Sequence, residues 1–351
     1  MTKKSATLKQ IKAASQKQKP KSLVSEKRPE GEFREKKPKT HLMGNRVKGK
    51  GKNGIDVISE SRNVHSVRFG RVHTGWEQWI MVTSDIHIDN KKCNRDLLKK
   101  HLELAKERKA LIFVFGDLFC AMQGKYDPRK NMEDIRPEDV HVNYLDKIVE
   151  HAAEFLAPYA SQIVVLGYGN HETSILDRHN ISLLDRLVTL LNQQGGQVMV
   201  GGFGGWVRFM ASTRGDGGES IKLRYFHGAG GGSAPVTRGV IDTSRQAVYL
   251  DGADIVCNGH NHEAYHVPIT TESLTIHGSQ KRGIMHFIRT PGYKDDWNKG
   301  AGGWAVEKGH PPKPLGCAWI KLGCERTQRK YNSAGGAQGN EMTLRVELHI
   351  Q

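Results

Sequence analysis

The stretch GYGNHET, residues 167–173, closes the apolar run QIVVLGY at residues 162–168 and places Asn170, His171 and Glu172 in a row at its end. A strand of consecutive apolar residues is expected to be buried on both faces, as in the parallel sheets of α/β proteins. Loops that leave the carboxyl ends of such strands commonly carry function. The stretch therefore predicts a buried strand with a functional group at its end.

The same kind of apolar run recurs along the chain, with amphipathic stretches between the runs. Further buried strands are predicted at WIMVTS (79–84), ALIFVFG (110–116), KLRYFHG (222–228) and ADIVCNG (253–259). Apolar residues at helical spacing predict helices over residues 97–105, 145–156 and 174–194. This alternation predicts an α/β fold, and the runs GIMHFIRT, GCAWIKLG and MTLRVELHI predict a second or mixed sheet. From residue 54 to residue 351 we expect one domain.

Each predicted strand ends in side chains that can bind a metal ion. The strand ends carry Asp85 and His87, then Asp117, then Asn170 with His171, then His227, and last His260 and His262. If the strands are roughly parallel in one sheet, their ends gather in one crevice, as ligand sites in open α/β sheets do. Glycines beside these residues let the backbone turn sharply and leave room for a ligand. We therefore expect these side chains to form one site.

Imidazole and carboxylate ligands together indicate a transition metal. Mn, Fe, Zn, Co and Ni accept both kinds of ligand, whereas Mg and Ca prefer oxygen alone. The donor residues are numerous enough for two ions. Two ions about 3.5–4 Å apart form the type of site that clamps the attacking and leaving oxygens of an in-line displacement at phosphorus. A single histidine is more often a surface or core residue, so the prediction depends on the whole set.

The ordered blocks DxH, GD, GNHE, H and GHxH, spread over residues 85–262, resemble the signature of calcineurin-like metallophosphoesterases. The resemblance implies a four-layered α/β/β/α sandwich with two divalent transition-metal ions, Mn first and Fe, Zn, Co or Ni as alternatives. It implies that Asp85, His87 and His262 hold one ion, that Asn170, His227 and His260 hold the other, and that Asp117 bridges both.

The same resemblance implies a chemistry. In such enzymes a hydroxide that bridges the two metals attacks phosphorus. The histidine of the GNH block, here His171, stabilises the transition state or protonates the leaving oxygen. Asp117 and His171 are therefore the expected catalytic residues. Glu172 is expected to orient groups around the ligands.

In motif style the chain is most similar to repair nucleases of the SbcCD type. The GD block of the Ser/Thr protein phosphatases in this superfamily continues into an aspartate–arginine pair, whereas here Gly116-Asp117 continues as Leu-Phe-Cys. GDLF followed by a long insertion, residues 120–140, and later by GHxH is similar to the nucleases. We therefore expect a phosphodiesterase, and a nuclease acting on DNA or RNA. A small-molecule phosphomonoesterase, a cyclic-nucleotide phosphodiesterase and a non-catalytic binding protein remain as alternatives.

Four residues outside the blocks are candidates for substrate contacts. The segment RTPGYK offers Arg289, Tyr293 and Lys294 to a phosphate or a base, although an ordinary hairpin turn explains the segment equally well. His266 is expected to line the pocket.

Two further features have local interpretations. Asp89 is expected to cap the helix that begins near Asn94 rather than to support the ligands. The glycine-rich segment GAGGGSAP, residues 228–235, resembles a phosphate cradle, but it is expected to form a flexible turn that leads to a helix around Ser244.

Most of the net charge of +16 lies in the first 53 residues, which hold 17 Lys and Arg against 4 Glu and leave +3 for residues 54–351. This basic tail has few apolar residues, one aromatic residue and no sustained periodicity. It cannot offset the entropy cost of ordering and is expected to be disordered. Segments rich in Lys and Arg bind nucleic acid through its phosphates, so nucleic acid is the expected partner.

Other features of the sequence disfavour the membrane and secreted classes. No apolar run is long enough to span a bilayer, and the first residues are rich in lysine rather than apolar, so we expect neither membrane association nor a secretory signal. The five cysteines are widely spaced and form no CxxC motif, which is typical of reduced thiols rather than of a disulfide framework or a zinc ribbon. We expect a cytoplasmic protein.

Overall fold

The computed structural model describes residues 48–50, 54–121, 132–214, 217–228, 239–276, 278–297, 309, 311–329 and 337–350. They belong to one unit, Met43–Gln351. None of the helices among them is long and apolar enough to cross a membrane. The rest of the basic tail, most of residues 120–131 and most of GAGGGSAP lie outside the described residues. Within the tail, Lys48–Lys50 forms strand β1, so the sheet includes residues that the sequence assigned to the disordered segment.

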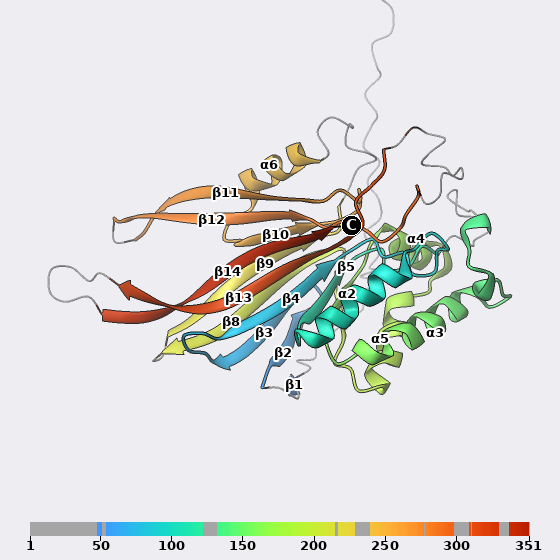
Figure 1. The fold of residues 1–351 in the computed structure, drawn as a ribbon, viewed down its shortest axis with the longest axis horizontal. Coiled ribbons are helices and arrows are strands. Elements are labelled where there is room, and N and C mark those ends of the chain that lie inside the picture. Colours follow the sequence, from blue (N-terminus) through green and yellow to red (C-terminus); the bar gives the residue numbers. More distant parts are fainter. Residues whose placement is uncertain are drawn as a thin grey trace, which may run out of the picture. The chain divides into compact units, whose positions relative to one another are not determined.

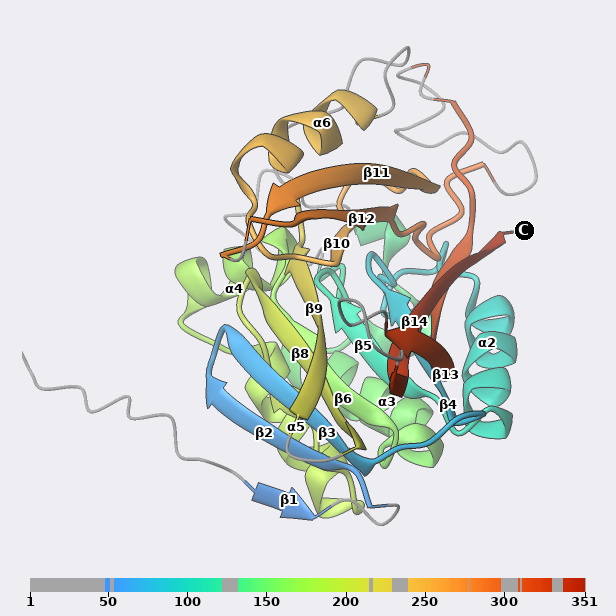
Figure 2. The ribbon, with the colours of Figure 1, turned by 90° about the vertical axis from the view of Figure 1, so that its left-hand side faces the viewer.

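Two β-sheets form the centre of the fold (Figures 1 and 2). The six-stranded sheet has the order β14 (Ala337–Ile350), β13 (Gly316–Arg329), β4 (Glu77–Thr83), β5 (Leu111–Phe115), β6 (Ile163–Gly167) and β7 (Met199–Val200). The eight-stranded sheet has the order β1, β2 (Asp56–Ser61), β3 (Val64–Arg71), β8 (Gly204–Arg214), β9 (Gly217–Phe226), β10 (Ile255–Asn258), β12 (Gln280–Arg289) and β11 (Tyr265–Leu274). Strands β4 to β7 are parallel, as are β9, β10 and β12.

Helices cover the outer faces of both sheets (Figure 2). The six-stranded sheet carries α2 (Arg95–Glu107), α3 (Tyr144–Leu156), α4 (Asn170–His179) and α5 (Leu183–Gln193), and the eight-stranded sheet carries α6 (Val240–Tyr249). Short 3-10 turns span Met132–Asp134, Pro137–Asp139 and Ala157–Tyr159. The inner faces of the sheets bury each other: Phe115 of β5 stacks on Tyr225 of β9 with ring centroids 4.3 Å apart. The protein is thus the predicted four-layered α/β/β/α sandwich.

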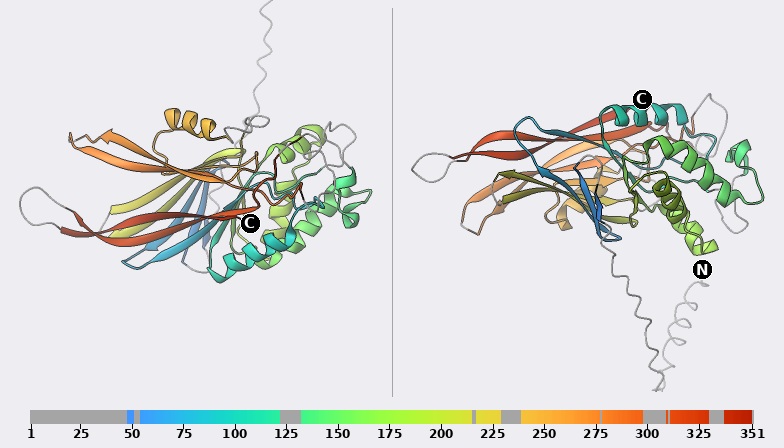
Figure 3. Two further views of the ribbon diagram at one scale, coloured as in Figure 1. Left: turned by 45° about the horizontal axis from the view of Figure 1, so that its top comes forward. Right: turned by 90° about the horizontal axis from the view of Figure 1, so that it is seen from below.

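Two long hairpins, β11–β12 and β13–β14, extend away from helices α3 and α5 (Figures 1 and 3). Strand β13 is antiparallel to β4, and Ala318 near its start pairs with Val82 near the end of β4. The end of β13 at Arg329 and the start of β14 at Ala337 therefore lie at the opposite end from the carboxyl ends of β4, β5 and β6.

The sequence predicted one helix over residues 174–194, and the structure has two, α4 and α5. Helix α4 ends at His179 and is capped by Asn180, whose φ of 54° is left-handed and cannot continue a right-handed helix. The hydroxyl of Ser182 then caps α5 by accepting a hydrogen bond from Asp185 N at 3.2 Å. The start of α4 places the GNHE block in the first turn of a helix.

Candidate metal centre

The predicted ligands come from strand ends of both sheets. Asp85 and His87 follow β4, Asp117 follows β5, Asn170 begins α4 after β6, His227 follows β9, and His260 and His262 follow β10. The strands do not share one sheet, because β9 and β10 belong to the eight-stranded sheet. The ends of the two sheets still meet at one edge of the sandwich, where His227 Nε2 lies 3.1 Å from Asp117 Oδ2.

Five of these residues have a left-handed backbone. The angle φ is 52° at Asp85 and at His87, 51° at Asp117, 76° at His260 and 55° at His262. Residues other than glycine rarely adopt this conformation, and such backbone strain is concentrated at functional sites. The turns come directly after the strands and bring the side chains of neighbouring strand ends together.

Asp85, His87 and His262 form the first donor group, with one ligand atom of each within 4.8 Å of the others. Oδ2 of Asp85 accepts hydrogen bonds from the hydroxyl of Ser84 and from the backbone N–H of His260, the latter at 2.8 Å. His87 Nδ1 is buried and makes no hydrogen bond with any described residue. Asp85 Oδ1 is also buried, and it faces His262 Nε2 at 3.4 Å. A buried polar atom without a hydrogen bond is costly, and a cation bound by these residues would stabilise the imidazole of His87 and the carboxylate of Asp85.

Asp117, His227 and His260 form the second donor group, and Asn170 joins it. Asn170 Oδ1 lies 3.0 Å from His227 Nε2 and 2.8 Å from His260 Nδ1. His227 Nδ1 lies 3.1 Å from the carbonyl oxygen of Phe115, so both of its ring nitrogens face acceptor oxygens. Burial alone would lower the pKa of His227, but the charge and hydrogen bond of Asp117 raise it to about 10. His227 Nε2 thus faces the oxygens of Asp117 and Asn170, a position that suits a proton or a metal ion.

Two glycines of the motifs are required by close packing. A Cβ on Gly169 would lie 2.1 Å from Oδ1 of Asp117, and a Cβ on Gly259 would lie 2.2 Å from the hydroxyl oxygen of Ser84. Any larger residue would displace Asp117 or the hydroxyl that holds Asp85, because these distances are far below van der Waals contact.

Glu172 is fully buried beside the centre and accepts hydrogen bonds from three backbone N–H groups. The donors are Asp117 N at 3.1 Å, Phe119 N at 2.9 Å and Gly169 N at 2.9 Å. Burial and the negative charge of Asp117 raise the pKa of Glu172 to about 8. These contacts are those of a residue that orients the chain around a ligand.

Asp89 holds the chain beyond Asp117 and does not cap α2. Its carboxylate accepts hydrogen bonds from Cys120 N at 2.5 Å, from Ala121 N at 2.7 Å and from the Tyr144 hydroxyl at 2.9 Å. Helix α2 is capped instead by Asn94, whose Oδ1 accepts from Leu97 N at 3.0 Å. The expected cap was wrong because the chain folds Asp89 inward, where it is 2% exposed.

His171 lies between the first donor group and Asp117 and keeps partial exposure. Its Nδ1 lies 2.6 Å from the carbonyl oxygen of Cys120, and its backbone N–H donates to Asp117 Oδ1 at 2.9 Å. Its Nε2 lies 3.8 Å from Asp117 Oδ2, and its ring centroid lies 4.9 Å from that of His87. The residue expected to act on the leaving group is thus adjacent to both sets of donors.

The RTPGYK residues differ in accessibility. Arg289 is 4% exposed and donates from Nη1 to the carbonyl oxygen of Gly259 at 2.7 Å. Tyr293 is fully buried, and its hydroxyl lies 2.8 Å from His101 Nδ1. These two side chains therefore support the fold around the site, and they do not reach an open surface. Lys294 is half-buried.

His266 lies near the start of the edge strand β11, and it is half-buried. Its Nε2 lies 2.9 Å from Nδ1 of His286 on β12, and the two rings are stacked. The structure does not bring His266 into either donor group.

An aromatic cluster that the sequence did not predict lies beside the second donor group. The Phe203 ring is 5.4 Å from the His227 ring and 5.5 Å from the Phe226 ring. The Arg224 guanidinium lies 5.9 Å from the ring centroid of Phe226 and 5.8 Å from that of Trp206. We call Phe203, Trp206, Arg224 and Phe226 the aromatic ledge, and all four are half-buried. The sequence feature from which this cluster could have been predicted is the pair of aromatic residues among glycines in GGFGGW, residues 201–206.

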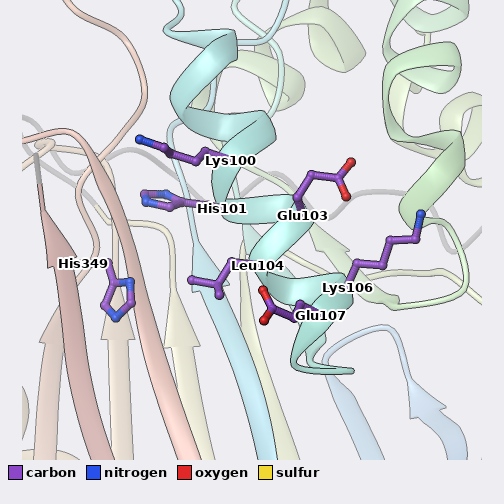
Figure 4. Close-up of a pocket in the computed structure, with 7 residues that line it drawn as sticks. All are labelled: Lys100, His101, Glu103, Leu104, Lys106, Glu107 and His349. Atoms are coloured by element: carbon purple, nitrogen blue, oxygen red, sulfur yellow. The ribbon is translucent and has the colours of Figure 1, made fainter.

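A cavity of 720 Å³ lies elsewhere, between α2 and the end of β14 (Figure 4). It is lined by Lys100, His101, Glu103, Leu104, Lys106, Glu107 and His349. In Figure 4, the side chain of His101 extends toward His349, whereas the side chains of Glu103 and Lys106 point away from His349. None of these residues belongs to a metal-competent group among the described residues, so the cavity is not the candidate centre.

No family model and no curated protein matches the chain. Among solved structures, it is similar to a conserved uncharacterized protein of Streptococcus pneumoniae, described as a predicted phosphoesterase, at 12% identity and a TM-score of 0.25, covering 77% of this chain and 99% of the other. It is also similar to a Thermotoga maritima protein solved by NMR, at 10% identity and a TM-score of 0.29, over 78% of this chain and 99% of the other. A third similar structure is GAP50, the anchor in the inner membrane complex of Plasmodium, at 11% identity and a TM-score of 0.31, over 78% of this chain and 89% of the other. Such values do not place the chain in a family.

Proposed function

We propose that the chain is a metal-dependent phosphoesterase that holds two divalent transition-metal ions and hydrolyses phosphodiesters. The observation that carries this proposal is the meeting of two donor groups at one end of the sandwich, where the described residues give the buried His87 Nδ1 no hydrogen bond. Asp85, His87 and His262 would hold one ion and Asn170, His227 and His260 the other, with Asp117 shared. Imidazole nitrogens with carboxylate and amide oxygens suit Mn, with Fe, Zn, Co or Ni as alternatives.

When bound, two such ions supply Lewis acidity and activate the attacking water. The chain's own residues position the reacting groups. The backbone N–H of His171 holds Asp117 Oδ1 at 2.9 Å. The carbonyl oxygen of Cys120 holds His171 Nδ1 at 2.6 Å, and Nε2, 3.8 Å from Asp117 Oδ2, would hold a proton or give it to the leaving oxygen.

We further propose that the substrate is a nucleic acid. The aromatic ledge supports this proposal, because proteins bind unpaired bases by stacking them on aromatic rings and arginine. A base stacked on Phe203 would lie next to the second donor group, given the 5.4 Å between the rings of Phe203 and His227. The basic tail supports it as well, since its charges attract phosphates at long range.

A small-molecule phosphoesterase is the second candidate. It is favoured by the net charge of only +3 on residues 54–351, because a nearly neutral catalytic body attracts polyanions weakly. In that case the basic tail serves another binding role.

A substrate panel with the full-length chain and Mn²⁺ tests these proposals. The panel contains a phosphomonoester, a base-free diester, a cyclic nucleotide, single-stranded DNA and RNA, and duplex DNA. Hydrolysis of diesters that stops in a chelator supports the phosphoesterase, and no hydrolysis of any member with Mn, Fe, Zn, Co or Ni overturns it. A higher kcat/KM for DNA or RNA than for the base-free diester supports the nuclease. The reverse order supports the small-molecule enzyme.

A further inference from the structure

Cys120 places a thiol beside two histidines of the candidate centre. One ring nitrogen of His87, one ring nitrogen of His171 and Sγ of Cys120 all lie within 4.8 Å of one another. Cys120 is 2% exposed and His87 is 3% exposed, whereas His171 keeps partial access to solvent. Among the described residues, His87 Nδ1 makes no hydrogen bond.

The backbone and the thiol of Cys120 are both held in place. Asp89 accepts hydrogen bonds from the N–H groups of Cys120 and Ala121, at 2.5 and 2.7 Å. The carbonyl oxygen of Cys120 lies 2.6 Å from His171 Nδ1. Asn90 Nδ2 donates to Sγ of Cys120 at 3.2 Å. The thiol therefore has a defined position next to the two imidazoles.

A thiol and two imidazoles form a softer donor set than either donor group of the centre. Thiolate ligands select zinc over manganese, which prefers oxygen. Zinc binds sulfur at about 2.3 Å and nitrogen at about 2.0–2.1 Å, so tetrahedral ligands stand roughly 3.3–3.8 Å apart. Shifts of about an ångström would bring the three donor atoms to that spacing, and water would be the fourth ligand of a tetrahedral ion.

We infer that His87, Cys120 and His171 form a third metal position that takes zinc or a similarly soft ion and inhibits the enzyme. The inhibitory effect rests on the proposed function, whereas the binding does not. An ion in this position withdraws His87 from Asp85 and His262, and it withdraws His171 from the leaving oxygen. Binding releases the thiol proton to solvent and changes no oxidation state.

Cadmium titration of the Mn-loaded, full-length chain tests the inference, since cadmium is a soft probe of thiolate sites. The first readout is the ultraviolet charge-transfer absorption of a cadmium–thiolate bond, which cadmium bound to the two cysteine-free donor groups cannot produce. The second readout is hydrolysis, expressed relative to the Mn-supported rate of each variant. The unaltered chain should show a band that saturates at one cadmium per chain, with inhibition over the same concentrations. Cys120→Ser should lose the band and need at least roughly tenfold more cadmium for half-inhibition.

Matched variants make the outcome specific. Cys257→Ser should keep both the band and the inhibition, because Cys257 is equally buried but packs in the core between the sheets. His171→Gln keeps the thiol and removes one imidazole, so it should weaken cadmium binding in the absorption readout even if Cys120→Ser fails to fold. No band in the unaltered chain, or a band retained by Cys120→Ser, overturns the inference. A band without hydrolysis of any panel substrate leaves the metal position standing and rejects the proposed function.

Discussion

The carboxylate of Glu172 holds the backbone of Asp117, whose N–H donates to Glu172 Oε2 at 3.1 Å. The same oxygen accepts from Gly169 N, and Oε1 accepts from Phe119 N, both at 2.9 Å. N–H groups from the ends of β5 and β6 thus converge on one buried carboxylate. This arrangement sets the spacing between the GD and GNHE blocks.

Glu172→Gln should therefore loosen the centre without removing a ligand. The glutamine amide presents an NH₂ group to backbone N–H donors, which leaves buried donors unsatisfied at a cost of about 1–3 kcal/mol in the free energy of unfolding. Metal affinity should fall about 10–100-fold, as is typical when a group that orients a ligand is lost. Urea unfolding and a metal-chelator competition measure the two effects. Glu154→Gln on the exposed face of α3 is the control, and equal results for both variants would contradict the assigned role.

Asp117→Asn should abolish hydrolysis and leave the circular dichroism spectrum unchanged. Asp117 is the ligand that the two proposed ions share. Because activation of the attacking water depends on both ions being held together, the loss of the Asp117 charge should stop the reaction. Steady-state rates and metal content by elemental analysis give the answer. Full hydrolysis by the variant, or by the unaltered chain in a chelator, would reject the two-metal proposal.

His171→Ala should keep both ions and lose roughly 10²- to 10⁴-fold in rate, the range typical of general acid–base groups. The reason is that His171 is assigned to the leaving oxygen and to neither ion of the active centre. Metal analysis of the purified variant separates the two roles. If the purified variant contains no metal, His171 is a metal ligand and its assignment to the leaving oxygen is wrong.

Deletion of residues 1–47 should raise KM for long DNA or RNA and flatten the dependence of log K on log salt. The truncation stops before β1, which belongs to the sheet, and it removes +10 of the net charge of +16. The slope is about −0.9 per duplex phosphate neutralised, so it reports directly on the lost contacts. Turnover of a small diester is the control and should not change. An unaltered salt slope would make the tail a linker or a docking segment and favour the small-molecule enzyme.

His65 should make the fold sensitive to acid. It is fully buried, and burial lowers its pKa from 6.5 to about 4. Between pH 6.5 and pH 4 the unfolded chain therefore binds more protons than the folded chain. The contribution of neutral His65 to the free energy of unfolding is fully present above pH 6.5. As the pH decreases toward 4, the free energy of unfolding falls by on the order of 3 kcal/mol. In urea unfolding, His65→Leu should show a smaller loss of stability between pH 7 and pH 4 than the unaltered chain. An unchanged pH dependence would contradict the assignment.

Local pattern in the sequence was enough to locate the five strands that precede the motif blocks and the helices α2 and α3. It also identified the side chains that the structure brings together at the sheet edge, because an apolar run and the residues that follow it are neighbours in the chain. The motif resemblance led to the correct layered fold. The roles of Asp85, Asp117 and the histidines as metal ligands stay predictions, to be decided by the metal analyses above.

Only the tertiary structure decided the features that depend on contacts between distant segments. The division of the strand ends between two sheets follows from pairings such as β4 with β13, whose partners are over two hundred residues apart. The inward turn of Asp89 and the burial of Tyr293 depend on packing that no local periodicity records. The aromatic ledge and the position of Cys120 beside His87 and His171 likewise arise from the approach of separate strand ends. A local pattern reports which face of an element is buried, whereas the long-range packing determines which residues meet there.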